Sequence, residues 1–598
     1  MRKFTFLMVA LVVSTLAMAQ MSGTYKVGTA EATPNFTSLS AAVTALNANV
    51  FSADVVLEIS SDITEAANIG LGVNTYGYKI TIKPQTGITP TITFTQTATQ
   101  SIDGNFVIGS PTVSSTNLVA TNNVTIDGSN KVNGTTKDMT FLGSVTSSAV
   151  SNFRIFGNND FVTIKNCTIT NRSTSGSSTA PVNVTNFISG TSNLAPDNFT
   201  LDNNTLSSVA GNGGIGVLLS NSGTPGVGMT GVTVSNNIIS HRGTRAIMCN
   251  YVNDANIFGN QISADIQQAG SACAGIFLTT GFATAGTFNI YNNKFSSIKT
   301  LNNTAGVSNG YICIDNQLGT LKVVNIYNNY ITGFTPTAAV SNTKLYGIRQ
   351  IGASTTNVFN NTIVIPEMTD MTTFGSSFIT GIVFGTAATP EVSPTGTMNV
   401  QNNIILSNET VMKTIGIRRA GTTGTFSSDH NVIYRANTTA GFCGFYNTSD
   451  ASDLLAWQTA SSMDANSKSV AVNFASATDL SLVGNSIQND NLKVPSLTTV
   501  LTDIFGTVRN TTYTYAGAHE AALPFVSTDI KNNIEQVARI MHTSTGIQVE
   551  LDGVALIELF SVNGIMIEKK TVSGTYSHDL NNGIYIIRIN GKATKFIK

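Results

Sequence analysis

One short stretch of sequence is repeated through the middle of the chain. FNIYNNKFSSI occupies 288–298, VNIYNNYITGF occupies 324–334, and the same frame returns elsewhere with altered letters. With the second asparagine of each pair as a marker, the gaps between copies range from 23 to 42 residues. The markers are Asn204, Asn237, Asn260, Asn293, Asn329, Asn361, Asn403 and Asn431. A fixed unit that carries loops of different length is the signature of a solenoid.

Each unit reads as two strand segments joined at a bend. The residue three before the marker is aliphatic and the residue two after it is apolar, as with Ile290 and Phe295 around Asn293. Because side chains alternate along a strand, we expect both positions to face the interior. The asparagine pair is then a corner, since asparagine tolerates the left-handed conformation that a sharp bend needs. Amides stacked from coil to coil are expected to hydrogen-bond to one another.

A further strand, seen in AGIFLTT and TGIVFGT, recurs in the same units. Two or three strands per coil predict an all-β fold, the parallel β-helix. A propeller would need a more regular period of about 40 residues. Parallel crossovers are right-handed, so we expect a right-handed helix. Leu39, Ala42, Val43 and Leu46 have helical spacing and predict a helix that caps the N-terminal end.

The two ends of the sequence differ from the repeats. Residues 1–19 have a basic start, an apolar run and a small-x-small site, which predict a signal peptide. We assign 20–110 to the N-terminal cap and first coils, and 111–525 to the β-helix. From 530 to 598 charge is denser, and strand patterns joined by Asn-Gly turns predict a small antiparallel sandwich. We expect no transmembrane segment in the mature chain, since no later stretch is apolar for long enough.

Three segments resemble known families. GTYKVG with NFTSLSAAVTALNA resembles the opening of secreted pectate-lyase-like β-helix proteins of Bacteroidota. LLAWQTASSMDANS and TDIFGTVRNTTYTYAGAHE resemble the segment that closes such helices. The latter carries a D-x-x-G-x-x-R…G-A-x-E pattern at Asp503, Gly506, Arg509, Gly517, Ala518 and Glu520. ELFSVNGIMIEKKTV through the final lysine resembles the type A C-terminal sorting domain of the type IX secretion system. This resemblance implies that the secretion machinery recognises 530–598 and delivers the protein to the cell surface or the extracellular space.

Composition argues against several classes of function. Charged residues make up 11% of the chain and the net charge is −1, so no basic stripe suggests nucleic acid. The acids on the repeats are scattered over different coils, and no catalytic carboxylate pair is visible. They are Asp202, Asp254, Asp265, Asp315, Asp370 and Asp429. The five cysteines are far apart and are expected to be core thiols. We predict no metal and no cofactor, because even calcium would need grouped acids.

Two other clusters favour structural roles. Asp429 and His430 stand side by side, but His430 occupies the first-asparagine position of a corner. SHRGTR places His241, Arg242 and Arg245 after a corner, where a solvated loop is the expectation and contact with an anionic sugar is the alternative.

Two outward columns are the candidate ligand-binding residues. Phe258, Tyr291, Tyr327 and Phe359 precede consecutive corners and are expected to form an aromatic strip. Flat ring faces suit sugars, although a loop-covered ladder that only stabilises the stack is the alternative. Arg349 and Arg418 share another repeat position; they suit carboxylates or sulfates, or are ordinary surface arginines. The sequence favours a non-catalytic glycan-binding or adhesion protein. A lyase or glycosidase acting on an acidic polysaccharide and a passive structural surface protein are the alternatives.

Overall fold

The computed structural model divides the chain into two compact units, Met1–Pro524 and Phe525–Lys598. It describes residues 20–598 apart from 31–34, 97–103, 114–116, 175–178, 186–194, 210–213, 221–227, 267–272, 280, 282, 301–309, 337–343, 369–376, 386–393 and 523–537. The expected signal peptide and Asp370 lie outside the described residues.

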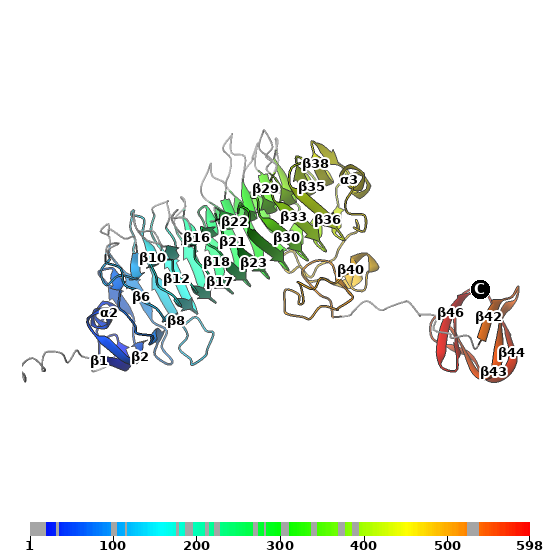
Figure 1. Cartoon of the computed structure of the whole chain (residues 1–598), viewed down its shortest axis with the longest axis horizontal. Coiled ribbons are helices and arrows are strands. Elements are labelled where there is room, and N and C mark those ends of the chain that lie inside the picture. Colours follow the sequence, from blue (N-terminus) through cyan, green and yellow to red (C-terminus); the bar gives the residue numbers. More distant parts are fainter. Residues whose placement is uncertain are drawn as a thin grey trace, which may run out of the picture. The chain divides into compact units, whose positions relative to one another are not determined.

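The first unit is the expected right-handed parallel β-helix, with three sheets whose strands stack in chain order (Figure 1). Sheet 1 precedes the asparagine corner, sheet 2 follows it, and sheet 3 completes the coil. Sheet 1 contains β1 Gln20–Val27, β2 Val50–Ile59, β5 Ile80–Pro84, β8 Val124–Asp127, β11 Thr163–Lys165, β14 Thr200–Asp202, β17 Val232–Ser235, β20 Ala255–Phe258, β23 Gly286–Tyr291, β26 Lys322–Tyr327, β30 Thr355–Phe359, β33 Thr397–Gln401 and β36 Thr425–Asp429.

The other two sheets repeat the same order. Sheet 2 contains β3 Ile63–Glu65, β6 Thr91–Phe94, β9 Met139–Leu142, β12 Cys167–Asn171, β15 Thr205–Ser208, β18 Ile238–His241, β21 Gln261–Ile266, β24 Lys294–Thr300, β27 Tyr330–Ile331, β28 Phe334–Pro336, β31 Thr362–Ile365, β34 Ile404–Ser407 and β37 Val432–Arg435. Sheet 3 contains β4 Ile69–Leu71, β7 Gly104–Ile108, β10 Ser151–Phe156, β13 Val182–Thr185, β16 Ile215–Ser220, β19 Arg245–Asn250, β22 Cys273–Thr279, β25 Tyr311–Asn316, β29 Lys344–Gln350, β32 Phe378–Phe384, β35 Lys413–Ala420, β38 Gly441–Asn447 and β39 Ser449–Ala451.

The two asparagines of each corner have different tasks. The first adopts the left-handed conformation, with φ of 56° at Asn292 and 54° at Asn328, and His430 takes the same role with φ of 56°. The second points inward and is buried, and its amide nitrogen donates to the amide oxygen of the next coil. This inner ladder runs through all eight markers; the Nδ2–Oδ1 distance is 3.0 Å from Asn293 to Asn329 and 2.9 Å from Asn329 to Asn361. The expected corner and its amide ladder are confirmed.

The interior is one continuous apolar core. The two predicted inward positions line it, and Ile290 and Phe295 are both fully buried. The cysteines also belong to this buried material: all five are free thiols, as expected. Within the described residues no helix is both long and apolar enough to cross a membrane.

The N-terminal end is capped by α2, Leu39–Ala48, at the predicted place. The predicted apolar face of Leu39, Ala42, Val43 and Leu46 is buried. The hydroxyl of Ser38 accepts from the backbone N–H of Ala41, and the buried carboxylate of Glu65 accepts from Leu39 N at 2.7 Å. A negative charge at the N-terminus of a helix is stabilised by the helix dipole and by the free N–H groups there.

The C-terminal end is closed by α3, Leu454–Ser461, and the residues after it. Trp457 is fully buried, its indole N–H donates to Asp464 at 2.7 Å, and its ring lies against Gly444 of the last long strand. Asp464 also accepts from Asn431, so it ends the inner ladder.

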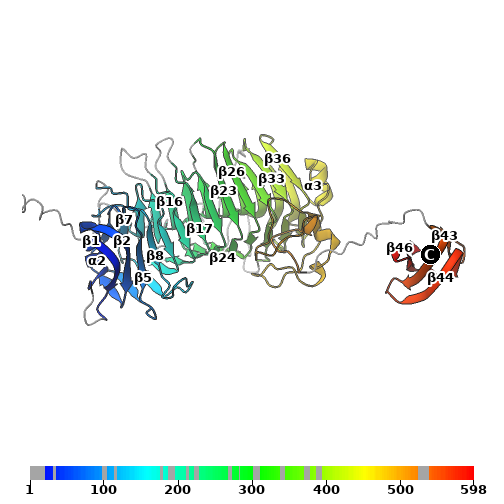
Figure 2. The same cartoon turned by 60° about the horizontal axis from the view of Figure 1, so that its bottom comes forward.

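The rest of the predicted closing segment does not cap the helix. Residues 493–520, here called the strap, lie along the side over sheet 2 and its corner (Figure 2). Two short 3-10 helices, Gly484–Ser486 and Asp490–Leu492, precede the strap. Within it, β40 Lys493–Pro495 pairs with β41 Tyr513–Tyr515.

The D-x-x-G-x-x-R…G-A-x-E pattern holds the strap in place. Buried Arg509 donates to Glu520 at 3.1 Å and to the corner residue Asn328 at 2.8 Å. Asp503 accepts from the backbone N–H of Glu520. Gly517 has φ of 83°, and a Cβ there would lie 2.7 Å from Ile404, so a side chain does not fit.

The second unit is a small antiparallel all-β domain, as expected, and its five strands form one sheet. Its strands are β42 Ala538–His542, β43 Gly546–Ser561, β44 Met566–Asp579, β45 Ile584–Ile589 and β46 Lys592–Ile597. One edge of β43 pairs with β42 in its first half and with β45 in its second, and a register shift lies between the halves beside Gly553. Ile547, Leu559, Ile587 and other apolar side chains from both halves share one core.

Candidate functional site

Sheet 1 carries the predicted aromatic column on its outer surface. Phe258, Tyr291, Tyr327 and Phe359 are partners in register on β20, β23, β26 and β30. The centroids of Phe258 and Tyr291 are 4.8 Å apart at an interplanar angle of 9°, and those of Tyr291 and Tyr327 are 4.9 Å apart at 0°. The rings are neither fully buried nor fully exposed.

This stacking corrects one expectation. The sequence predicts flat ring faces that sugars contact, but both faces of Tyr291 lie against neighbouring rings. What the column offers to solvent is therefore a row of ring edges. The phenolic hydroxyls of Tyr291 and Tyr327 have no hydrogen-bond partner among the residues that the structure describes. Partial burial raises the pKa of Tyr327 to about 12, so this group stays protonated and can donate.

An amide column runs beside the aromatic column, two residues earlier on each strand. Each Nδ2 donates to the Oδ1 of the preceding coil at 2.9 Å. The members are Asn256, Asn289, Asn325, Asn357 and Asn399, and the hydroxyl of Ser427 continues the row at 2.8 Å. This outer ladder was not predicted. Its signal is present in the repeat, because an asparagine stands four residues before each of five corner markers. These markers are Asn260, Asn293, Asn329, Asn361 and Asn403.

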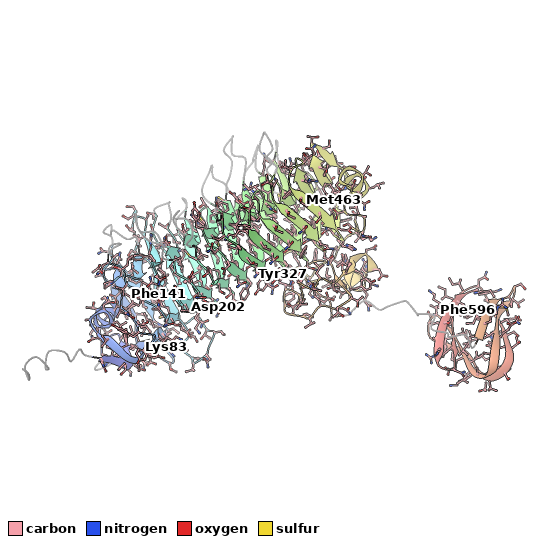
Figure 3. All side chains as sticks on the ribbon, viewed as in Figure 1. Lys83, Phe141, Asp202, Tyr327, Met463 and Phe596 are labelled. Atoms are coloured by element: carbon pink, nitrogen blue, oxygen red, sulfur yellow. The ribbon has the colours of Figure 1, made fainter. Side chains whose placement is uncertain are left out.

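A third column completes the surface. Thr287, Val323, Thr355, Thr397 and Thr425 align two residues before the amides, and all are at least partly exposed. We call the outward side chains of these three columns on β20, β23, β26, β30 and β33 the strip. Tyr327 marks it in Figure 3.

Two features border the strip. At the corner, the side-chain amide of Asn328 donates to Thr502 O at 2.6 Å, and that of Asn402 donates to Pro495 O at 2.7 Å. The strap therefore lies alongside β26, β30 and β33. At the far end, a hollow of about 240 Å³ is lined by Asn399, Val400, Gln401, Ser427, Ser428 and Asp429. Asp429 there lies 3.2 Å from His430 and accepts from Asn466.

The two predicted arginines do not meet the aromatics, because they belong to sheet 3. Arg349 and Arg418 do lie two coils apart in one column, with Val383 between them. Neither is an ordinary surface residue, since they are only 3% and 5% exposed. Arg349 forms a two-point pair with Asp315, at 2.9 and 2.8 Å, and Arg418 stacks 3.6 Å from the ring centre of Phe445. Asp315, one of the scattered repeat acids, is thus a buried ion-pair partner.

The SHRGTR cluster also differs from its expectation. His241 is fully buried and its Nε2 lies 3.0 Å from the hydroxyl of Tyr311. Burial lowers the pKa of His241 to about 3, so its ring is neutral. Arg245 is partly buried with its guanidinium 4.3 Å from the ring centre of Phe277. Arg242 alone is a surface residue, 3.6 Å from Asp265. Within the described parts of the chain, no three histidine, cysteine or acidic side chains are grouped to hold a metal ion.

Comparisons with known proteins assign no function to these columns. No family model matches the chain, and no curated protein matches it. Among solved structures, the chain is similar to the A-module of mannuronan C-5 epimerase AlgE4 of Azotobacter vinelandii. The identity is 13%, the match covers 66% of this chain and 91% of that chain, and the TM-score is 0.33. A likeness at this level says nothing about the chemistry of either sheet.

Proposed function

We propose that this protein binds glycan along the strip without cleaving it, at the cell surface or in the extracellular space. The observation that carries the proposal is the ordered surface of sheet 1, where threonine, amide and aromatic columns repeat on successive coils and stay open to solvent. Sugars present hydroxyls beside apolar C–H surface, and a row of amides, phenolic hydroxyls and ring edges complements both.

The binding proposal is tested by native affinity electrophoresis of the protein in gels that contain neutral or acidic polysaccharides. We expect retardation by at least one glycan, and we expect Tyr291→Ala with Tyr327→Ala to abolish it. A matched control is Tyr76→Ala with Tyr434→Ala, because Tyr76 is an exposed residue of the first coils, before β5, and Tyr434 lies on sheet 2. Retardation that survives in the first pair would refute the strip as the binding face.

Product chromatography of the same mixtures separates binding from catalysis. Intact polysaccharide is the expected result. Shortened chains would replace the proposal with a lyase or glycosidase, and the absence of retardation on every glycan would leave a structural surface protein.

We also propose export through the type IX secretion system by way of residues 530–598. The support is the resemblance of ELFSVNGIMIEKKTV and the following strands to the type A sorting domain, together with the division of the chain near that point into two units. In a bacterium that has this system, we expect deletion of 530–598 to retain the protein in the periplasm. A periplasmic reporter that carries 530–598 is the reciprocal control and should reach the cell surface or the medium. Export of the truncated chain would contradict the proposal.

A further inference from the structure

The strip is uncharged over its whole length. The three columns on β20, β23, β26, β30 and β33, all of which the structure describes, consist of threonine, valine, asparagine, glutamine, phenylalanine and tyrosine. Lys322 begins β26, but it is buried and its ammonium group reaches 3.2 Å from the backbone oxygen of Asn253. The charges that border the strip in these columns are acidic: Asp254 immediately before β20, Asp202 on β14 and Asp429 on β36. A strongly anionic ligand would find no cation here, so the strip suits a neutral one.

The outer ladder retains hydrogen-bonding capacity. An asparagine amide has two N–H donors and an oxygen with two lone pairs. Asn289, Asn325 and Asn357 each use one N–H and one lone pair in hydrogen bonds to their neighbours along the ladder. One donor and one acceptor therefore remain on each rung. They recur once per coil at the strand spacing, as do the hydroxyls of Tyr291 and Tyr327.

The direction of the repeat sets the direction of the ligand. Groups of one kind recur along the helix axis, with Val323 and Gln401 as the exceptions, whereas across the strip the groups change from threonine to amide to aromatic ring. A polymer with identical units finds equivalent contacts only if it runs along the axis. An extended β-1,4-linked glycan advances per sugar by close to one strand spacing, and its pyranoses present hydroxyls at their edges. Because both faces of Tyr291 and one face each of Phe258 and Tyr327 are occupied by neighbouring rings, contact there is made with ring edges rather than by stacking.

We propose that the strip takes a linear, uncharged, extended polysaccharide of the β-1,4-linked class, which lies parallel to the helix axis with one sugar per coil. This inference rests on the glycan-binding function proposed above. The outer ladder has one amide rung on each of the five coils of the strip, and Ser427 adds a hydroxyl rung on β36, so the full site holds about five or six sugars.

The test is calorimetric titration of the full chain with neutral β-1,4-linked glucose and N-acetylglucosamine oligomers, from disaccharide to octasaccharide. We expect affinity to rise with each added sugar and to level off near the hexasaccharide. A plateau at two or three sugars would mean that the chain crosses the three columns, and would overturn the axial arrangement.

Two substitutions refine the test. Asn325→Ala removes a rung from the middle of the ladder and should weaken hexasaccharide binding by about two- to tenfold, the effect of one or two lost hydrogen bonds. Asn256→Ala removes the terminal rung and should have a smaller effect on the same ligand. Equal effects of the two substitutions would contradict a ligand centred on the strip.

The outcomes also separate this inference from the broader function. Binding of oligogalacturonides but not of neutral oligomers would overturn the neutral class and leave glycan binding intact. Binding of neither class of oligomer, together with no retardation by any polysaccharide, would remove both proposals.

Discussion

Replacing Arg509 by alanine is expected to release the strap from the side of the β-helix. The guanidinium donates to Glu520, Thr514, the corner residue Asn328 and the backbone oxygen of Gly517, at 2.8–3.1 Å. Arg509 is 4% exposed and Glu520 is 6% exposed, so the substitution leaves a buried carboxylate without its cation. Removing one partner of a buried ion pair typically costs about 3–5 kcal/mol. That loss falls on the strap, whose other contacts with the helix are uncharged hydrogen bonds, such as those from Asn328 and Asn402, and the packing of the Phe505 ring beside Tyr330 and Lys294.

Hydrogen exchange of residues 493–520 measures this effect directly. We expect Arg509→Ala to lose protection throughout the strap, while β23 and β26 in the helix keep theirs. The matched control is Lys413→Ala, which breaks a pair with Asp450 of which both side chains are about one-third exposed; such surface pairs contribute about 1 kcal/mol or less. Replacing both buried partners, with Arg509→Met and Glu520→Leu, should restore part of the protection. Unchanged protection in Arg509→Ala would show that other contacts hold the strap.

The repeat made the helix predictable because its rules are local. Alternation along a strand fixes which of Ile290 and Tyr291 faces inward, and the left-handed preference of asparagine fixes the corner beside them. Neither inference needs knowledge of distant residues. The capping helix was predictable for the same reason, since helical spacing of Leu39, Ala42, Val43 and Leu46 is a local pattern.

The predictions that were wrong concern which outward-facing residues are covered by other parts of the chain. Arg349 and Arg418 were correctly placed in one column, but their burial depends on parts of the chain that periodicity does not reach. The strap is a similar case, because its contact between Arg509 and Asn328 joins residues 181 apart in sequence. The resemblance of this segment to closing segments indicates that it packs on the β-helix. It does not indicate whether the segment packs on the end of the helix or on its side.

The sequence predicts one of the two main columns of the candidate site. The aromatic column follows from one position of the repeat. The amide column has an equally regular position, four residues before the marker, but it is not among the predicted site residues. Stacking of the rings also follows from their shared repeat position. The prediction errs in its consequence, because rings stacked at the strand spacing hide the faces that lie between them.

Replacing Asn329 by alanine should cause the largest loss of stability within the helix. Its amide nitrogen donates to Ile290 O, Tyr327 O and Asn361 Oδ1 at 2.9–3.0 Å. Its amide oxygen accepts from both the backbone and the side-chain nitrogen of Asn293 at 3.0 Å. Asn329 is fully buried, so water does not replace these partners. Each buried polar group left unpaired costs about 1–3 kcal/mol, and a total of at least about 3 kcal/mol is expected.

Urea unfolding followed by circular dichroism measures the loss, and fluorescence of the single tryptophan, Trp457, reports separately on the C-terminal cap. Asn325→Ala is the matched control, since Asn325 lies on the same coil, four residues earlier, with its amide in the outer ladder. Water can reach that partly exposed surface, so its loss should cost about 1 kcal/mol or less. Asn329 thus stabilises the fold, whereas Asn325 contributes to ligand binding. Asn329→Ala should unfold at a lower urea concentration, and Asn325→Ala should bind ligand more weakly while it remains folded. Similar unfolding midpoints for the two variants would mean that the inner ladder does not stabilise the helix in this way.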